Sequence, residues 1–140
     1  MSERSGYRLD DQVGFVLRQA HQRHAALFSS LMIEGLTPMQ WAAMSKLAEV
    51  GACSQNLLGR LTAMDAATIK GVIDRLILRG LARAVADADD ARRRVIELTQ
   101  AGAEVCARAE PLAHEITART LSPLSPEEQR LLVGLLKRLA

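Results

Sequence analysis

The sequence predicts a mainly α-helical protein with one small β-hairpin. Hydrophobic residues make up 49% of the 140 residues but aromatic residues only 3%, and Ala and Leu are abundant, which favours helices packed on helices over a β-sandwich. Apolar residues recur at alternating spacings of four and three near both ends of the chain, and two strand-compatible runs flank a charged loop at residues 87–93. This length suffices for one domain with helical extensions.

The first predicted element is a long amphipathic helix from about Asp10 to Leu31. Gly35 follows it as a helix terminator. His24 occupies one position of its apolar stripe, and we expect it to be a satisfied histidine at a helix interface. The other residues of the stripe are Val13, Leu17, Ala20, Leu27 and Leu31.

A second helix is predicted from Thr37 to about Val50. Thr37 is the expected N-cap, Pro38 fits the first helical position, and Gln40 completes a capping box. Gly51 then stops the helix.

Two short helices joined by a turn come next. Ser54 is predicted to cap a helix that ends near Leu61, and after the turn at residues 62–64 Asp65 caps the following helix. One face of this second helix is predicted to be firmly buried, because apolar residues recur at helical spacing. They are Ile69, Val72, Ile73, Leu76 and Ile77.

A charged hairpin follows the helix pair. Gly80 stops the helix, residues 81–86 and 94–98 are compatible with two short strands, and the loop between them places aspartates before arginines. We expect Asp90 to hold Arg92 in an extended pose through a local ion pair. A helix-turn-helix followed directly by a charged hairpin indicates a winged helix-turn-helix, which binds duplex DNA.

The charge distribution favours the same interpretation. Residues 54–94 hold eight Lys or Arg against five Asp, whereas the rest of the chain holds ten against eleven acids. The positive excess therefore lies on the segment predicted to bind DNA.

The outer face of the second helix, centred on Ala67, Gly71 and Asp74 by its rotation of about 100° per residue, supplies candidate contacts. Small residues there allow the backbone to sink into the major groove. Ala67 can contact a thymine methyl, whereas Thr68 and Lys70 can donate to base edges or phosphates.

Flanking residues complete the predicted DNA interface. Arg75 is suited to a phosphate or to a local pair with Asp74. Ser54 and Gln55 can offer hydroxyl, amide and backbone N–H groups to a phosphate. Arg92 is suited to the minor groove, which leaves Arg93 and Arg94 to the DNA backbone or to internal pairs.

Two helices are predicted after the hairpin. The first starts near Thr99 and ends before Pro123, with a stripe formed by Val105, Ala109, Leu112 and Ile116. Ser125 and Glu128 form a capping box at the start of the last helix, which carries Leu131, Leu132, Leu135, Leu136 and Leu139. Packing between two copies of the chain would bury these stripes, although they can instead cover their own domain.

The sequence lacks the residues that are characteristic of enzymes, of metal or cofactor proteins, and of membrane or secreted proteins. There is no nucleophile elbow, phosphate-binding glycine loop or obvious acid–base pair, so we do not expect an enzyme. Cys53 and Cys106 lie far apart in the sequence, and the chain has only three histidines. We therefore expect neither a metal nor another cofactor. No run spans a bilayer and residues 1–11 lack the core of a signal peptide, so we expect a cytoplasmic protein without membrane contact.

The segments DAATIKGVIDRLILRGLA and DADDARRRVIELTQAG resemble the recognition helix and wing of the MarR family of bacterial transcription regulators. The resemblance covers about residues 10–140. Ala91 departs from it, since many relatives carry an arginine there, which leaves Arg92 as the wing-tip candidate. The segment CSQNLLGRLTAMDAATIKGV is similar to regulators of aromatic-acid catabolism within the family.

The resemblance implies a single MarR-type domain over residues 1–140, with dimerisation helices at 8–35 and 100–140 and a DNA-binding lobe at 37–99. Such a homodimer binds a pseudo-palindromic operator and usually represses transcription. A small, often aromatic and anionic effector would bind between the dimerisation helices and the DNA-binding lobe. The candidate effector-binding residues are Arg18, His21, Gln22 and Trp41.

Each effector candidate also has a purely structural interpretation. Arg18 can pair with a carboxylate or remain a solvated charge, and Trp41 can stack on an aromatic ring or belong to the core. Two alternative functions stay open: a thiol-redox-responsive regulator of the same fold, and a helical oligomerisation module that does not bind DNA.

Overall fold

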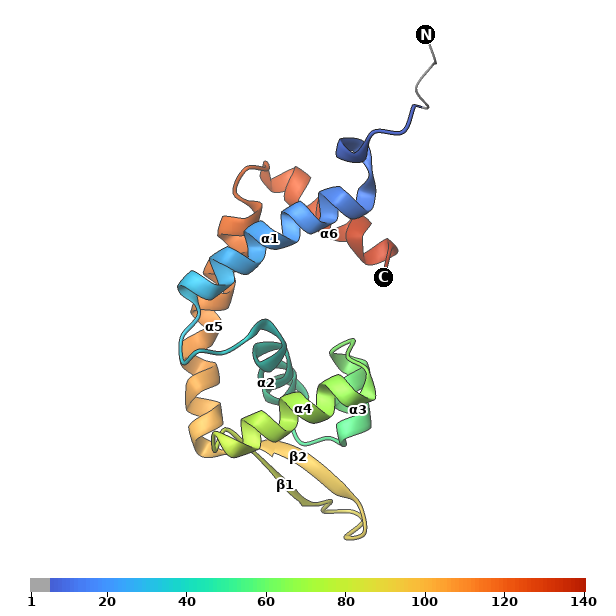
Figure 1. Cartoon of the computed structure of the whole chain (residues 1–140). Coiled ribbons are helices and arrows are strands. Elements are labelled where there is room, and N and C mark those ends of the chain that lie inside the picture. Colours follow the sequence, from blue (N-terminus) through green and yellow to red (C-terminus); the bar gives the residue numbers. More distant parts are fainter. Residues whose placement is uncertain (1–5) are drawn as a thin grey trace. The chain divides into compact units, whose positions relative to one another are not determined.

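The computed structural model describes residues 6–140 and confirms a mainly helical fold with one hairpin (Figure 1). Residues 1–5 lie outside the described residues. The prediction that residues 1–11 are not a signal peptide falls partly on them. The elements are a 3-10 turn at Leu9–Asp11, α1 (Val13–Leu31), α2 (Pro38–Val50), α3 (Gln55–Leu61), α4 (Ala66–Leu78), β1 (Ala82–Ala86), β2 (Arg94–Leu98), α5 (Gln100–Leu121) and α6 (Pro126–Arg138).

These elements form two compact units. Within the described residues, one unit comprises residues 32–114, and the other comprises residues 6–31 together with residues 115–140. The helix α5 contributes its first part to the former unit and its end to the latter. In the part of the chain that the structure describes, no helix is both long enough and apolar enough to cross a membrane.

The predicted starts of α2 and α6 are confirmed, because each helix begins with the predicted capping box. The Thr37 hydroxyl accepts from the Gln40 backbone N–H at 3.1 Å, and the Gln40 side chain accepts from the Thr37 N–H at 3.2 Å. Ser125 and Glu128 form the same reciprocal box at the start of α6. Each box satisfies N–H groups that a helix start otherwise leaves unpaired.

The predicted start of the first helix at Asp10 is wrong. Gln12 adopts an extended conformation with φ −86° and ψ 135°, which interrupts the helix between the 3-10 turn and Val13. The side-chain amide of Gln12 donates to the Arg8 carbonyl at 2.8 Å. The helix α1 therefore begins only at Val13.

The unit of residues 32–114 has one hydrophobic core. The predicted buried face of α4 supplies Ile69, Val72, Ile73 and Leu76, but Ile77 is 38% exposed, so its predicted burial is wrong. Residues from α2, α3, the hairpin and the first part of α5 complete this core: Ala43, Met44, Leu47, Cys53, Leu58, Leu81, Ala82, Ile96, Val105, Cys106 and Ala109, together with Leu36 before α2.

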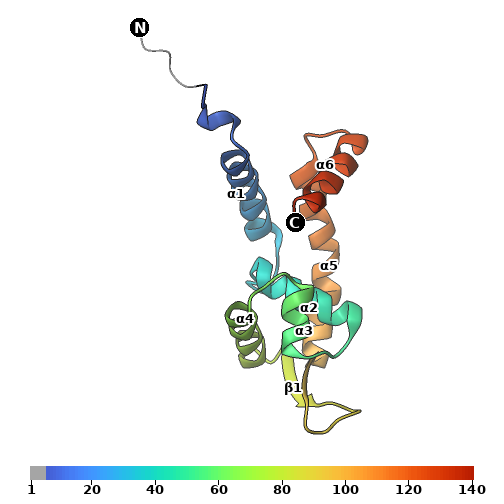
Figure 2. The same cartoon turned by 90° about the vertical axis from the view of Figure 1, so that its right-hand side faces the viewer.

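The hairpin pairs β1 with β2 in antiparallel register, from Ala82 opposite Leu98 to Ala86 opposite Arg94. Cys53 adds a short bridge to Ile96, with backbone hydrogen bonds of 3.1 and 2.7 Å. Figure 2 shows the hairpin, hereafter the wing (residues 82–98), extending beyond α2, α3 and α4. The bridge at Cys53 ties the base of the wing to the segment before α3.

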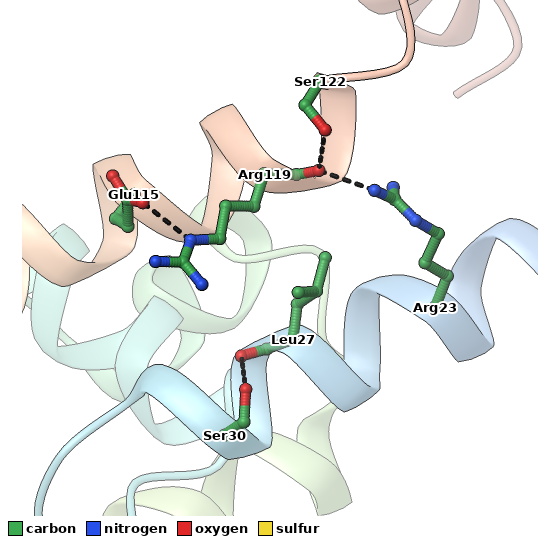
Figure 3. A network of polar contacts seen from close by, with 6 residues as sticks. All are labelled: Arg23, Leu27, Ser30, Glu115, Arg119 and Ser122. Atoms are coloured by element: carbon green, nitrogen blue, oxygen red, sulfur yellow. Dashed lines mark hydrogen bonds and ion pairs between the residues drawn. The ribbon is translucent and has the colours of Figure 1, made fainter.

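In the other unit, α1 packs beside the end of α5 (Figure 3). The Arg23 guanidinium donates to the Thr120 carbonyl and, at 2.7 Å, to the Arg119 carbonyl. These are carbonyls that a helix end leaves without an intrahelical partner. His24 Nδ1 lies 2.9 Å from the Thr120 hydroxyl, which confirms the prediction that His24 is satisfied; an interface between two copies remains a prediction.

Large apolar side chains are exposed near both ends of the described chain. In α1 the first part of the predicted stripe is uncovered, since Val13 is 66% and Leu17 43% exposed. In α6 the exposed side chains are Leu131, Leu132, Val133, Leu135 and Leu136. The single chain therefore leaves uncovered the surface that the sequence predicts to pack in a dimer.

Candidate nucleic-acid interface

The helices α3 and α4 are each fixed by a side-chain cap. The Ser54 hydroxyl accepts from the Leu57 N–H at 3.1 Å, and the Asp65 carboxylate accepts from the Thr68 N–H at 2.7 Å. The pKa of Asp65 lies below its ordinary value because the backbone N–H and hydroxyl of Thr68 bond to the carboxylate. Both predicted caps are thus confirmed.

The two helices pack closely. Gly59 of α3 is buried, and a Cβ there would lie 3.1 Å from Ile69 Cγ2 and 3.2 Å from the Met64 carbonyl. Ala63 turns the chain between the helices with a positive φ of 56°. This packing sets the orientation of α4 relative to the start of α3.

The outer face of α4 carries the predicted reading residues. Ala67 and Lys70 are exposed and Thr68 is half-buried. Lys70 Nζ lies 2.8 Å from Asp74 Oδ2. The predicted alternative in which Arg75 pairs with Asp74 is therefore replaced by a Lys70–Asp74 pair, and Arg75 is exposed.

The C-terminal end of α4 is also held in place. The guanidinium of Arg79, the C-cap residue directly after α4, donates to the Glu34 carbonyl. Arg108 of α5 pairs with the Glu34 carboxylate at 3.1 Å. Glu34, whose φ is positive at 59°, thus links Arg79 at the end of α4 to Arg108 of α5 within the same unit.

The wing tip is ordered by aspartates. Asp90 Oδ1 accepts from the Arg92 N–H at 3.0 Å and lies 3.2 Å from Arg92 Nε. These contacts, with help from the Arg93 charge, hold the pKa of Asp90 below its ordinary value. The Arg92 side chain is 92% exposed. The predicted Asp90–Arg92 pair is confirmed, and it leaves the guanidinium on the surface.

The remaining predicted DNA contacts lie in the same unit. Arg93 and Arg94 are exposed, while Ser54 and Gln55 are half-buried at the start of α3. Sequence reasoning missed Asn56 and Arg60, which line an open hollow of about 210 Å³ between α3 and α4. Their spacing of four residues on α3, which places both on one face of a helix, is the sequence signal that could have shown them to be neighbours.

The two cysteines have the character of structural residues. Cys53 and Cys106 are both free and buried. Burial raises the pKa of each thiol, and the nearby Glu110 charge raises that of Cys106 further. Reactive cysteines instead have lowered pKa values and are accessible, so this environment does not favour the thiol-redox alternative.

The effector candidates fall in both units. Arg18, His21 and Gln22 are exposed and lie on one face of α1. The Arg18 guanidinium carbon is 5.6 Å from the centre of the Phe15 ring. Trp41 of α2 is half-buried and packs against the core of residues 32–114.

Comparisons with known proteins identify the family. The family model described as MarR family matches residues 34–93. The HTH-type transcriptional repressor NicR of Pseudomonas putida is 34% identical over 134 residues, which cover 95% of this chain and 85% of NicR. The chain belongs to the MarR family.

Two solved structures of transcriptional or DNA-binding proteins are similar to almost the whole chain. A probable transcriptional regulator from Pseudomonas aeruginosa is 56% identical with a TM-score of 0.91, covering 95% of this chain and all of that one. BpsR of Bordetella bronchiseptica, whose DNA binding is regulated by 6-hydroxynicotinic acid, is 36% identical with a TM-score of 0.90, covering 96% and 97%. This MarR-family chain is therefore a transcription regulator with a DNA-binding winged helix.

Proposed function

We propose that this MarR-family regulator is a repressor that binds a pseudo-palindromic operator as a homodimer and is released by a small aromatic acid. The observation that carries the proposal is the surface of one unit, where the outer face of α4 and the exposed Arg92 of the wing supply polar and cationic groups. The helix supplies contacts for the major groove and Arg92 for the minor groove, where negative potential is enhanced.

The homodimer is supported by the uncovered apolar side chains. Leu131 is 62% exposed and Leu139 72% exposed, and burial of such surface drives association. A two-fold dimer reads two half-sites about one helical turn, or roughly 34–36 Å, apart. One copy alone reads only a few base pairs.

The effector class is supported by side-chain chemistry and by BpsR. An arginine such as Arg18 recognises a carboxylate, and a tryptophan such as Trp41 stacks on an aromatic ring. His21 and Gln22 add polar groups beside Arg18 on α1. The acid would bind these residues more tightly in a conformation in which the spacing of the two recognition helices does not match consecutive major grooves. Its binding would therefore increase the share of dimers that cannot bind the operator.

Operator binding is tested first. Duplexes enriched by the purified protein from a randomised library are tested by footprinting for a two-fold pattern, and their affinity is measured over a salt series. We expect a steep loss of affinity with salt because phosphate contacts release counterions. A helical oligomerisation module without DNA binding would enrich no duplex, which would contradict the proposal.

Effector binding is tested by thermal shift with benzoic, hydroxybenzoic, nicotinic and 6-hydroxynicotinic acids, with cyclohexanecarboxylic acid as the non-aromatic control. A ligand at about 100 times its Kd stabilises the protein by roughly 2.7 kcal/mol. We expect Arg18→Gln to abolish this shift and the release of DNA. Arg8→Gln, which removes another exposed arginine before α1, should retain both; equal loss in the two variants would exclude Arg18 as the carboxylate partner.

A further inference from the structure

A carboxylate lies on the face of α4 that is turned away from the core. Asp74 Oδ2 is 2.8 Å from Lys70 Nζ, and the two side chains are 58% and 65% exposed. Val72 and Leu76, two residues before and after Asp74 and so on the opposite side of the helix, are buried. Asp74 thus faces outward on the helix that carries the proposed reading residues.

The Lys70–Asp74 pair contributes little to the fold. Ion pairs between exposed side chains add little stability, and a basic residue before an acid is the less favourable order on a helix. Asp74 also lies in the C-terminal half of α4 (Ala66–Leu78), where the helix dipole does not favour a negative charge. Stability alone does not account for an acid at this position.

A negative charge on a DNA-reading face has a clear effect on binding. Non-specific affinity comes from Lys and Arg contacts to phosphates, and Asp74 both occupies the Lys70 ammonium and repels phosphates. A carboxylate can accept a hydrogen bond from the amino group of cytosine in the major groove. Only a sequence that offers such a donor compensates for the repulsion.

We propose that Asp74 is a specificity-determining residue: it restrains Lys70 and penalises every duplex that lacks a hydrogen-bond donor opposite its carboxylate. This inference rests on the proposed reading role of α4. It adds a penalty against wrong sequences to the attractive contacts described above.

The chain offers a matched control on α2. Lys46 pairs with Glu49 at 2.9 Å, in the same order of charges and again in the C-terminal half of a helix of 13 residues. Glu49→Gln therefore makes the same change of net charge as Asp74→Asn without altering α4.

The experiment compares wild type, Asp74→Asn and Glu49→Gln on two probes: a duplex enriched by the wild-type protein and a scrambled duplex of the same composition. Release of Lys70 adds about one phosphate contact per subunit, or two for the dimer, which steepens the salt slope by about 1.8. The gain in scrambled-duplex affinity over wild type then grows roughly 12-fold for each fourfold reduction in salt. We expect the ratio of enriched to scrambled affinity to fall about tenfold in Asp74→Asn and to stay unchanged in Glu49→Gln.

A double variant separates the restraint from general charge effects. In the Lys70→Gln background, Asp74→Asn should no longer steepen the slope, while it still lowers the ratio. An unchanged ratio in Asp74→Asn, or equal changes in Asp74→Asn and Glu49→Gln, would overturn the inference while leaving DNA binding established. A wild-type protein that prefers no duplex would overturn both the inference and the proposed function.

Discussion

Gly102, in the first turn of α5, gives the sharpest test of the packing between α5 and Leu81, the residue before β1. A Cβ at this position would lie 2.0 Å from the Leu81 carbonyl oxygen and 2.9 Å from its carbon. That carbonyl is fixed because it accepts from the Thr99 N–H at 3.1 Å. Close C···O contacts are normally about 3.3 Å or more, so Gly102→Ala requires a backbone movement of about 1 Å.

The magnitude follows from two opposing contributions. Replacing a helical glycine with alanine gains about 1 kcal/mol, whereas overpacking costs about 1–3 kcal/mol and more where backbone must move. We expect a net loss of about 2 kcal/mol. At about 2–4 °C per kcal/mol for a chain of this size, the Tm of Gly102→Ala should fall by about 4–8 °C.

Two other helical glycines calibrate the measurement. A Cβ at Gly71 would meet nothing within 4 Å, so Gly71→Ala should gain about 1 kcal/mol. A Cβ at Gly59 would meet Ile69 Cγ2 at 3.1 Å, so crowding should offset the gain and leave the stability near that of wild type. The three substitutions make the same chemical change in three different surroundings.

The assay is thermal and urea unfolding at one fixed protein concentration, because the stability of a dimer depends on concentration. We expect the order Gly71→Ala, then wild type and Gly59→Ala together, then Gly102→Ala, with unchanged m-values. A Gly102→Ala protein as stable as wild type would refute the close approach of α5 to Leu81.

Three further predictions concern the interface and the effector. Arg92→Ala should weaken operator binding about tenfold while size-exclusion chromatography shows an intact dimer; an unchanged affinity across a salt series would remove the wing from the mechanism. Trp41→Ala should retain operator binding but lose DNA release by the aromatic acid, and an unfolded protein by circular dichroism would favour a core role instead. Asp65 has a lowered pKa in the folded chain, so its stabilising contribution is present above the unfolded pKa of about 3.9 and is lost as the pH falls through the folded value. The Tm advantage of wild type over Asp65→Asn should therefore shrink below about pH 4, and a constant difference from pH 7 to pH 3 would contradict this role.

Elements with local chemical signals were predictable from the sequence. The capping box at Thr37 and Gln40 places a helix start because the partners are three residues apart. The wing strands were predicted at 81–86 and 94–98 and lie at Ala82–Ala86 and Arg94–Leu98. In both places the interaction that defines the element lies within a few residues or across one tight hairpin.

Elements that depend on distant contacts were not predictable. The periodicity of Val105 and Ala109 indicates that one face of a helix is buried, but it does not say against what. The sequence interpretation favoured packing between two copies for these residues and kept packing within their own domain as the alternative. The structure buries them in the core that contains Ile69 and Ile96, in agreement with the alternative. The exposure of Ile77 arises in the same way, since helical spacing does not define where the covering elements end.

The polar contacts also divide into local ones, which the sequence can predict, and distant ones, which it cannot. On one helix, residues four apart face each other and adjacent residues do not. Helix geometry therefore favours Lys70 over Arg75 as the partner of Asp74, and it accounts for the absence of the Arg75–Asp74 pair that the sequence analysis left open. Arg23 is different, because its partners are the carbonyls of Arg119 and Thr120 at the end of α5. Ser122, which is local to the helix end, also donates to the Arg119 carbonyl, but no local pattern shows that a side chain from α1 donates to these carbonyls as well. The residues proposed to read DNA from α4 are thus open to inference from sequence, whereas the contacts between α1 and the end of α5 require the fold.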